Sequence, residues 1–204
     1  MKATLPLMDI DSAGNDAERP AVSGAGSQPP IILVGMMGAG KTTIGRQLAH
    51  ALGRKFLDLD HEMEARCGVR IALIFDIEGE AGFRKRETAL LDECSQRSGY
   101  VLATGGGAVL APENREILKA RGRVIYLRAG VDELFRRVAR DRNRPLLKAS
   151  DPRQRIAELI AQREPLYESV ADITLDTGNM PASQVLRSLL PHLLDYQAQE
   201  DARP

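Results

Sequence analysis

The chain has 204 residues, of which 43% are hydrophobic and 27% are charged, and its formal net charge is zero. This length suits one domain with a sizeable core, and a neutral chain has no global basic field for nucleic acid. No apolar run is long enough to span a bilayer, so we expect neither nucleic acid nor membrane as a partner. The two cysteines, Cys67 and Cys94, lack C-x-x-C spacing, and we expect reduced thiols in a cytoplasmic protein.

Residues 1–29 are rich in Ala, Gly, Ser, Asp and Pro and show no sustained periodicity. We interpret them as a disordered N-terminal extension, followed by a folded domain over 30–195 and a polar tail over 196–204. The first residues carry several acids and no apolar segment, so no secretory signal is predicted.

The most informative motif, G-x-x-x-x-G-K-[ST], occupies residues 35–42. It follows the apolar run 31–34, which predicts a strand, and it opens a segment over 41–52 with apolar residues at helical spacing. Such a P-loop cradles phosphate, because backbone N–H groups and a helix N-terminus face the ligand. The motif predicts that Lys41 bridges the β- and γ-phosphates of a nucleotide and that Thr42 ligates Mg²⁺.

Strands and helices alternate beyond this loop. Strands are predicted at 56–60, 100–103, 124–127 and 173–175, and helices at 61–67, 79–97, 112–120, 131–140, 156–167 and 181–195. Short apolar strands separated by helices predict an α/β fold in which helices cover both faces of a parallel sheet. Ligands bind such sheets at the carboxyl ends of the strands.

An acid pair and a glycine run follow two of these strands. Alternation along the second strand places Asp58 and Asp60 on one side. Phosphoryl transfer needs a carboxylate near the metal and one that orients the attacking hydroxyl or accepts its proton. Solvated acids, or Asp60 capping the next helix, are the alternative. After the third strand, Gly105, Gly106 and Gly107 let a ligand approach the backbone closely, although a flexible turn has the same composition.

Arginines accompany these segments. Arg84 lies near the start of a predicted helix and is a candidate clamp for a substrate carboxylate, whereas Arg86 is interpreted as solvated. Residues 139–152 are polar and mostly aperiodic, and we interpret them as an active-site lid that delivers Arg144 to the transferring phosphate. Arg163, on the next helix, is expected to face the same cleft.

The P-loop is followed in order by further motifs at 58–60, 79–84, 105–107, 144–147 and 163–167. This succession closely resembles the shikimate kinase family over roughly residues 30–195, and the N-terminal extension lies outside it. The resemblance implies a P-loop NTPase fold of the nucleoside-monophosphate-kinase type, with a five-stranded parallel sheet in the order 2-3-1-4-5. It also implies transfer of the γ-phosphate of ATP, with Mg²⁺, to the 3-hydroxyl of shikimate in aromatic amino acid biosynthesis. Separately, we expect the protein to be a monomer.

The resemblance also implies roles for individual residues. Those for ATP are Gly38, Ala39, Gly40, Lys41, Thr42, Thr43, Arg137 and Arg144. Those for shikimate are Asp60, Arg84, Gly105, Gly106, Gly107 and Arg163, and those for the metal are Thr42 and, through water, Asp58. The catalytic set is Lys41, Asp60 and Arg144. The family often has an arginine that packs on adenine after the last strand, but residues 176–181 contain none, and Arg137 is implied to lie along adenine.

Other functions compete with this interpretation. Another small-metabolite kinase, such as a gluconate kinase, shares the P-loop but would not need both Arg84 and Arg163 around a cyclic carboxylate. An adenylate kinase is disfavoured because no D-G-[FY]-P-R segment occurs, and a GTP-binding switch because N-K-x-D is absent, although residues 76–79 match D-x-x-G. A non-enzymatic ATP-binding module would leave Asp60 and the two arginines without a purpose.

Overall fold

The computed structural model describes residues 28–139 and 151–201, so residues 1–27 of the predicted N-terminal extension and residues 140–150 of the predicted lid lie outside the described residues. Within these ranges, five strands form one parallel sheet. They are β1 (Ile31–Val34), β2 (Lys55–Asp58), β3 (Tyr100–Ala103), β4 (Arg123–Arg128) and β5 (Ile173–Asp176). Their order is β2-β3-β1-β4-β5, which confirms the sheet implied by the family resemblance.

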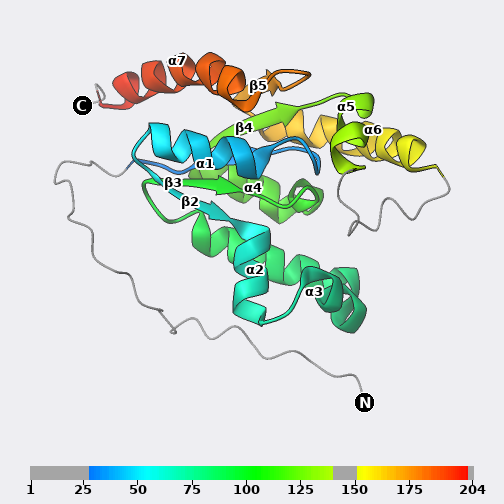
Figure 1. Ribbon diagram of the computed structural model, residues 1–204. Coiled ribbons are helices and arrows are strands. Elements are labelled where there is room, and N and C mark those ends of the chain that lie inside the picture. The colour runs from blue at the N-terminus through cyan, green and yellow to red at the C-terminus, as the bar shows by residue number, and fades with distance from the viewer. Residues whose placement is uncertain (1–27, 140–150, 202–204) are drawn as a thin grey trace.

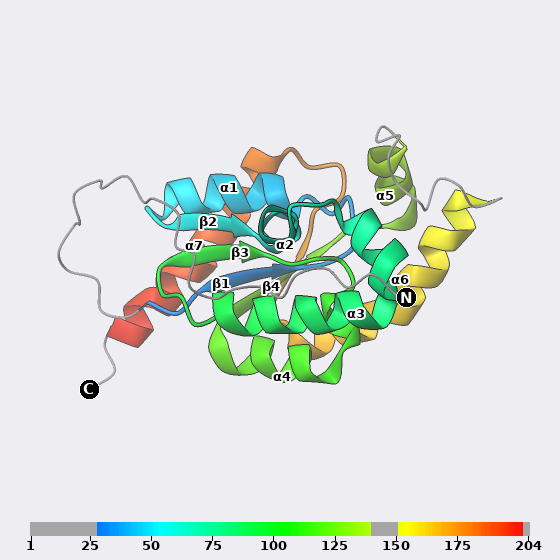
Figure 2. The same cartoon turned by 90° about the horizontal axis from the view of Figure 1, so that it is seen from below.

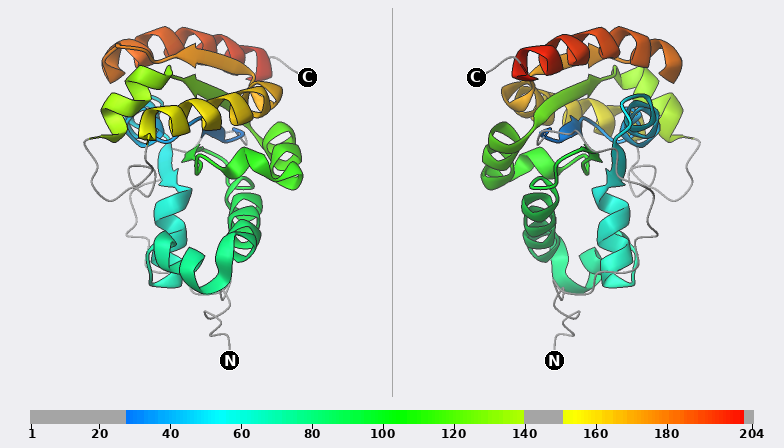
Figure 3. Two further views of the ribbon diagram at one scale, coloured as in Figure 1. Left: turned by 90° about the vertical axis from the view of Figure 1, so that its right-hand side faces the viewer. Right: turned by 90° about the vertical axis from the view of Figure 1, so that its left-hand side faces the viewer.

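Helices cover both faces of this sheet, as predicted (Figures 1 and 2). On one face, α1 (Lys41–Ala51) packs against α7 (Ala182–Asp201). The other face carries α4 (Pro112–Arg121), α6 (Pro152–Val170) and the second half of α3 (Ile71–Cys94). Helix α2 (Leu59–Cys67) and the start of α3 project beyond the β2 edge (Figure 3). The short helices η1 (Ala108–Leu110) and α5 (Val131–Val138) follow β3 and β4.

The centre of the sheet is apolar because both of its faces are covered. Every residue of β1 is buried. Helix α1 lies close to this strand at Gly45, where an added Cβ would lie 2.5 Å from the Phe56 ring and 3.0 Å from Leu33. This close approach fixes the start of α1, and therefore the P-loop, over the carboxyl edge of the sheet. Among the described residues, no helix is both long enough and apolar enough to traverse a bilayer.

Several boundaries differ from the sequence prediction, and α7 continues to Asp201, so the predicted polar tail over 196–204 is wrong at its start. Two further differences bear on the site. The predicted strand 56–60 is wrong at its end, because β2 stops at Asp58 and Asp60 lies in the first turn of α2. The Asp58 carboxylate caps that helix, since its Oδ1 accepts from the backbone N–H groups of Asp60 (3.1 Å) and His61 (3.4 Å). Helix α3 begins at residue 71 rather than 79, and Gly79 interrupts it with φ 71° and ψ −177°, a conformation that glycine adopts readily.

Candidate active site

The P-loop has the backbone conformation that its glycines allow. Gly35, Gly38 and Gly40 have φ values of 140°, 80° and 99°. An added Cβ would lie 2.6 Å from the Leu127 carbonyl oxygen at Gly35, and 2.9 Å from a methyl of Val138 at Gly38. Both the positive φ and the close packing therefore require glycine. The loop leads into α1, which begins at residue 41.

The lysine of the motif is held inside the loop. Lys41 is 9% exposed, and its Nζ donates to the carbonyl oxygens of Gly35 (2.8 Å) and Met36 (3.0 Å). A cavity of about 530 Å³, a size typical of small-ligand sites, lies against the loop. The residues that line it are Met37, Gly38, Ala39, Gly40, Lys41, Thr42, Thr43, Ile44, Asp58, Asp60, Thr104, Gly106, Arg137, Thr177, Met180, Ala182 and Val185. Except for Arg144, which lies outside the described residues, every residue implied for ATP lines this cavity.

The two acids occupy different positions in the cavity. The hydroxyl of Thr42 donates to Asp58 Oδ2 at 2.6 Å, so these two oxygens lie together at the start of α1. Hard oxygen ligands of this kind suit Mg²⁺, which takes one or two protein ligands and obtains the rest from phosphate and water. The described residues contain no cluster of three or more His, Cys, Asp or Glu side chains suited to a metal. Burial, followed by the charge of Asp58, raises the pKa of Asp60.

Asp60 meets a second carboxylate at the glycine run. An added Cβ on Gly105 would lie 2.8 Å from both Asp60 Oδ1 and Glu87 Oε1. Glu87 is 4% exposed, and burial raises its pKa, although Arg84 opposes that shift. Sequence reasoning missed Glu87. Its spacing of three residues from Arg84 on a predicted helix was the available signal.

The next two glycines meet the two predicted clamp arginines. The carbonyl oxygen of Gly106 accepts from Arg163 Nη1 at 3.2 Å and from the hydroxyl of Tyr167. An added Cβ on Gly107 would lie 2.5 Å from Arg84 Nη2 and 2.6 Å from its Nη1. Arg84 and Arg163 do not line the cavity, but Gly106 does, and its carbonyl oxygen is the one that accepts from Arg163. The structure thus brings both arginines to one end of the cavity.

The orientation of Arg84 is set by neighbouring carboxylates. Its Nη1 donates to Glu87 Oε2 at 2.6 Å, and its Nη2 donates to Glu80 Oε1 at 3.3 Å. Glu87 Oε1 and Arg163 Nε are buried atoms without a hydrogen-bond partner in the described part of the chain. Buried polar atoms are normally paired, so this end of the cavity is suited to a polar ligand.

The interpretation of Arg86 as solvated is wrong. Its Nε and Nη2 donate to the two carboxylate oxygens of Glu78 at 2.8 and 2.7 Å, and the two side chains are only 14% and 13% exposed. The pair connects residues on either side of Gly79. It therefore braces the interrupted helix that carries Arg84.

The sheet order, the P-loop at its carboxyl edge and the acid facing that loop define a P-loop kinase of the nucleoside-monophosphate-kinase type. Comparison with known proteins narrows this class. The family described as "Shikimate kinase" matches residues 37–194. A shikimate kinase of Bordetella avium is 66% identical over 168 residues, which span 82% of this chain and 80% of that relative. One of Bordetella pertussis is 60% identical over 197 residues, which span 93% of each chain.

A solved structure agrees with these relatives. Shikimate kinase from Acinetobacter baumannii in complex with shikimate aligns with a TM-score of 0.79 and 49% identity, over 83% of this chain and 95% of that chain. The chain belongs to the shikimate kinase family, whose members are phosphotransferases. This membership decides against a gluconate kinase, an adenylate kinase, a GTP-binding switch and a non-enzymatic ATP-binding module.

Proposed function

We propose that this protein transfers the γ-phosphate of ATP to the 3-hydroxyl of shikimate, giving shikimate 3-phosphate and ADP. Family membership supports the reaction, and the relative from Acinetobacter baumannii was solved with shikimate. One observation carries the proposal: the three glycines 105–107 meet, in order, the acid Asp60, Arg163 and Arg84 at one end of the P-loop cavity. An acid and two cations set around exposed backbone fit a hydroxylated carboxylate beside a nucleotide.

Recognition of shikimate is assigned to the residues at the glycine run. Arg84 and Arg163 would bind its carboxylate, because a guanidinium fork matches two carboxylate oxygens. The unpaired Arg163 Nε offers a further donor, and the unpaired Glu87 Oε1 offers an acceptor for a hydroxyl. A carboxylated polyol would satisfy both of these buried atoms. The backbone of Gly105, Gly106 and Gly107 would line the pocket.

Binding of ATP is assigned to the P-loop. Backbone N–H groups over residues 38–43 would surround the phosphates, and Lys41 would move from its loop carbonyls to bridge the β- and γ-phosphates. Thr42 would ligate Mg²⁺ directly and Asp58 would do so through water, and the ion would neutralise phosphate charge. Arg137 would lie along adenine. Arg144, outside the described residues, would reach the transferring phosphate from the lid.

Asp60 is proposed as the group that orients the attacking hydroxyl and accepts its proton. The new bond joins the 3-hydroxyl oxygen to γ-phosphorus while the bond from γ-phosphorus to the ADP oxygen breaks. A raised pKa makes Asp60 a stronger base than an ordinary aspartate. Lys41 and Arg144 would stabilise charge on the phosphoryl group as it moves.

The test is Mg²⁺-dependent ADP release with shikimate and gluconate assayed side by side. We expect ADP release with shikimate only. Phosphorus-coupled NMR of the product should show the phosphate on oxygen 3 of shikimate. Release with gluconate, or no dependence on shikimate, would contradict the proposal.

We also propose that the enzyme acts as a monomer, because one chain supplies every described site residue, and that it is cytoplasmic, because Cys67 and Cys94 are free thiols. Light scattering coupled to gel filtration checks the monomer.

A further inference from the structure

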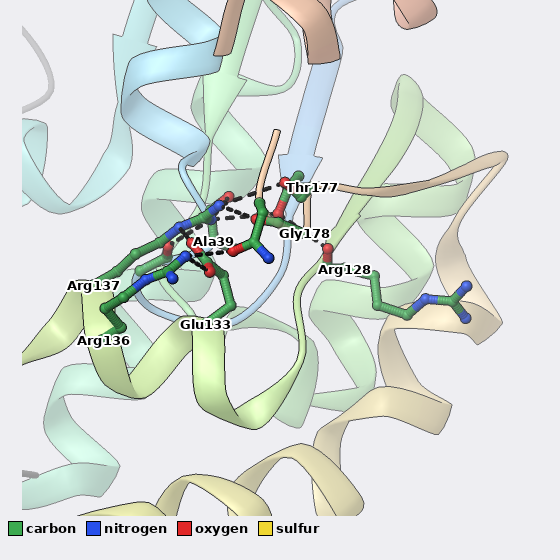
Figure 4. A network of polar contacts seen from close by, with 9 residues as sticks. Ala39, Arg128, Glu133, Arg136, Arg137, Thr177 and Gly178 are labelled. Carbon is green, nitrogen blue, oxygen red and sulfur yellow. Dashed lines mark hydrogen bonds and ion pairs between the residues drawn. The ribbon is translucent and has the colours of Figure 1, made fainter. Parts of the chain in front are cut away.

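Arg137 makes more polar contacts than stacking on a base requires (Figure 4). Its Nε donates to Glu133 Oε1 at 2.5 Å, and its Nη2 donates to the Gly178 carbonyl oxygen at 2.7 Å. Its Nη1 donates to the carbonyl oxygens of Gly38 (3.2 Å) and Ala39 (3.4 Å). The edge of this guanidinium therefore joins α5, the P-loop and the segment after β5.

Thr177 anchors this cluster to the sheet. It is 1% exposed, and its backbone N–H and its hydroxyl both donate to the Arg128 carbonyl oxygen, at 2.7 and 3.1 Å. Its hydroxyl oxygen also accepts from Arg137 Nη1 at 3.4 Å. The guanidinium thus donates to a hydroxyl that donates onward to the end of β4, and bonds that point in one direction polarise each other.

We expect the hydrogen bonds of Arg137 to make the P-loop more rigid. Its glycines give the backbone wide freedom, yet a phosphate cradle needs its N–H groups fixed in one direction. Lys41 Nζ holds the carbonyls of the first half of the loop, at Gly35 and Met36. Arg137 holds those of the second half, at Gly38 and Ala39. A carbonyl that accepts from a cation also polarises its peptide, so the N–H of that peptide becomes a better donor to phosphate.

We propose that Arg137 is a positioning residue for the P-loop and strengthens binding of the phosphate tail through the carbonyls of Gly38 and Ala39. The inference rests on the proposed function, in that the ligand of the loop is the triphosphate of ATP. Stacking on adenine would use the face of the guanidinium, whereas these bonds use its edge. A ligand without a base therefore separates the two roles.

The probe is inorganic triphosphate with Mg²⁺, measured by calorimetry beside ATP. Arg137→Met should weaken the binding of both ligands in parallel by about tenfold, because charge-assisted bonds are lost. Arg137→Lys keeps the charge but loses the fork, and should weaken both by about threefold or more. The matched control is Arg136→Met, since Arg136 bonds to Glu133 and Asn179 and, among the described residues, to no atom of the P-loop. It should bind triphosphate as the wild type does.

Two outcomes would overturn the inference. If Arg137→Met lost affinity for ATP but kept it for triphosphate, the residue would act on the base alone. If Arg137→Lys bound triphosphate like the wild type, charge alone would explain the effect. Thr177→Val removes the anchoring hydroxyl and should weaken the binding of triphosphate by about threefold. If Arg137→Met does not fold, wild-type affinity in Thr177→Val would overturn the inference. Absence of shikimate-dependent ADP release by the wild type would refute the proposed function and leave the triphosphate result intact.

Discussion

Replacing Gly107 with alanine tests the proposed clamp by steric displacement. Its φ of −102° and ψ of 0° are open to alanine, so the backbone adds no strain. The new Cβ would lie 2.5 Å from Arg84 Nη2 and 2.8 Å from its Cζ. The guanidinium must retreat by about 0.9 Å to reach ordinary van der Waals contact. That retreat should disturb the 2.6 Å hydrogen bond from Arg84 to Glu87. It should also move the Arg84 guanidinium away from the proposed position of the shikimate carboxylate.

The expected loss is that of one or two charge-assisted hydrogen bonds to the substrate. At about 1.5 to 3 kcal/mol for such a contact, kcat/KM for shikimate should fall by about tenfold to a hundredfold. The change should appear mainly as a higher KM for shikimate, with KM for ATP unchanged. Coupled ADP-release kinetics with either substrate varied will measure both constants, and thermal unfolding will show that the fold is kept.

A matched glycine provides the control. Gly130 has φ −70° and ψ 163°, and nothing lies within 4 Å of an added Cβ. Gly130→Ala should therefore leave both KM values at their wild-type levels. If Gly107→Ala showed the wild-type KM for shikimate, the assignment of Arg84 to the substrate carboxylate would be refuted.

Asp60→Asn should lower kcat by about a hundredfold or more, because the proposed proton acceptor is lost. Burial raises the pKa of Asp60, so its ionisation destabilises the fold as pH rises through that pKa, and the asparagine variant should melt at a higher temperature at pH 7. Calorimetry and a pH profile of kcat check both effects; near-normal kcat would remove Asp60 from its role. Thr42→Val should raise the Mg²⁺ concentration needed for half-maximal activity, and an unchanged Mg²⁺ dependence contradicts its assignment. Glu78→Gln, which weakens a partly buried ion pair, should lower the melting temperature and raise KM for shikimate; wild-type values of both would show that the Glu78–Arg86 pair is not needed.

The sheet and the P-loop were predictable from sequence because local and global signals agree there. Residues 31–34 are apolar throughout, as a strand buried on both faces requires, and the glycines of 35–40 have the conformations that the motif demands. The placement of the candidate site followed from the rule that parallel strands present ligands at their carboxyl ends. The roles of the individual side chains remain predictions.

The end of β2 was not predictable from alternation. Apolar and acidic residues alternate through residue 60, but the carboxylate of Asp58 caps the following helix, and this local bond ends the strand two residues earlier. Asp60 nevertheless lines the cavity, because the first turn of α2 faces the same edge of the sheet.

The roles of Glu78, Arg86 and Glu87 depend on burial, which no local pattern reveals. The spacing of Arg84 and Glu87 permits their ion pair, but a charged run on a helix is usually solvated. The sequence does not reveal that the packing of α3 against its neighbours shields these side chains from water. The first part of α3 was missed for a related reason. Gly79 is typical of a helix boundary, yet here it joins two helical segments.

The tight packing around residues 105–107 bears on inhibition and resistance. An added methyl would lie 2.8 Å from two carboxylates at Gly105, 3.2 Å from the Met37 nitrogen at Gly106 and 2.5 Å from Arg84 at Gly107. A drug that binds this backbone would contact a surface that point mutations cannot remodel without displacing those groups. Substitutions that confer resistance should therefore arise at other positions. An organism that needs the enzyme should grow poorly when it carries a substitution at residues 105–107.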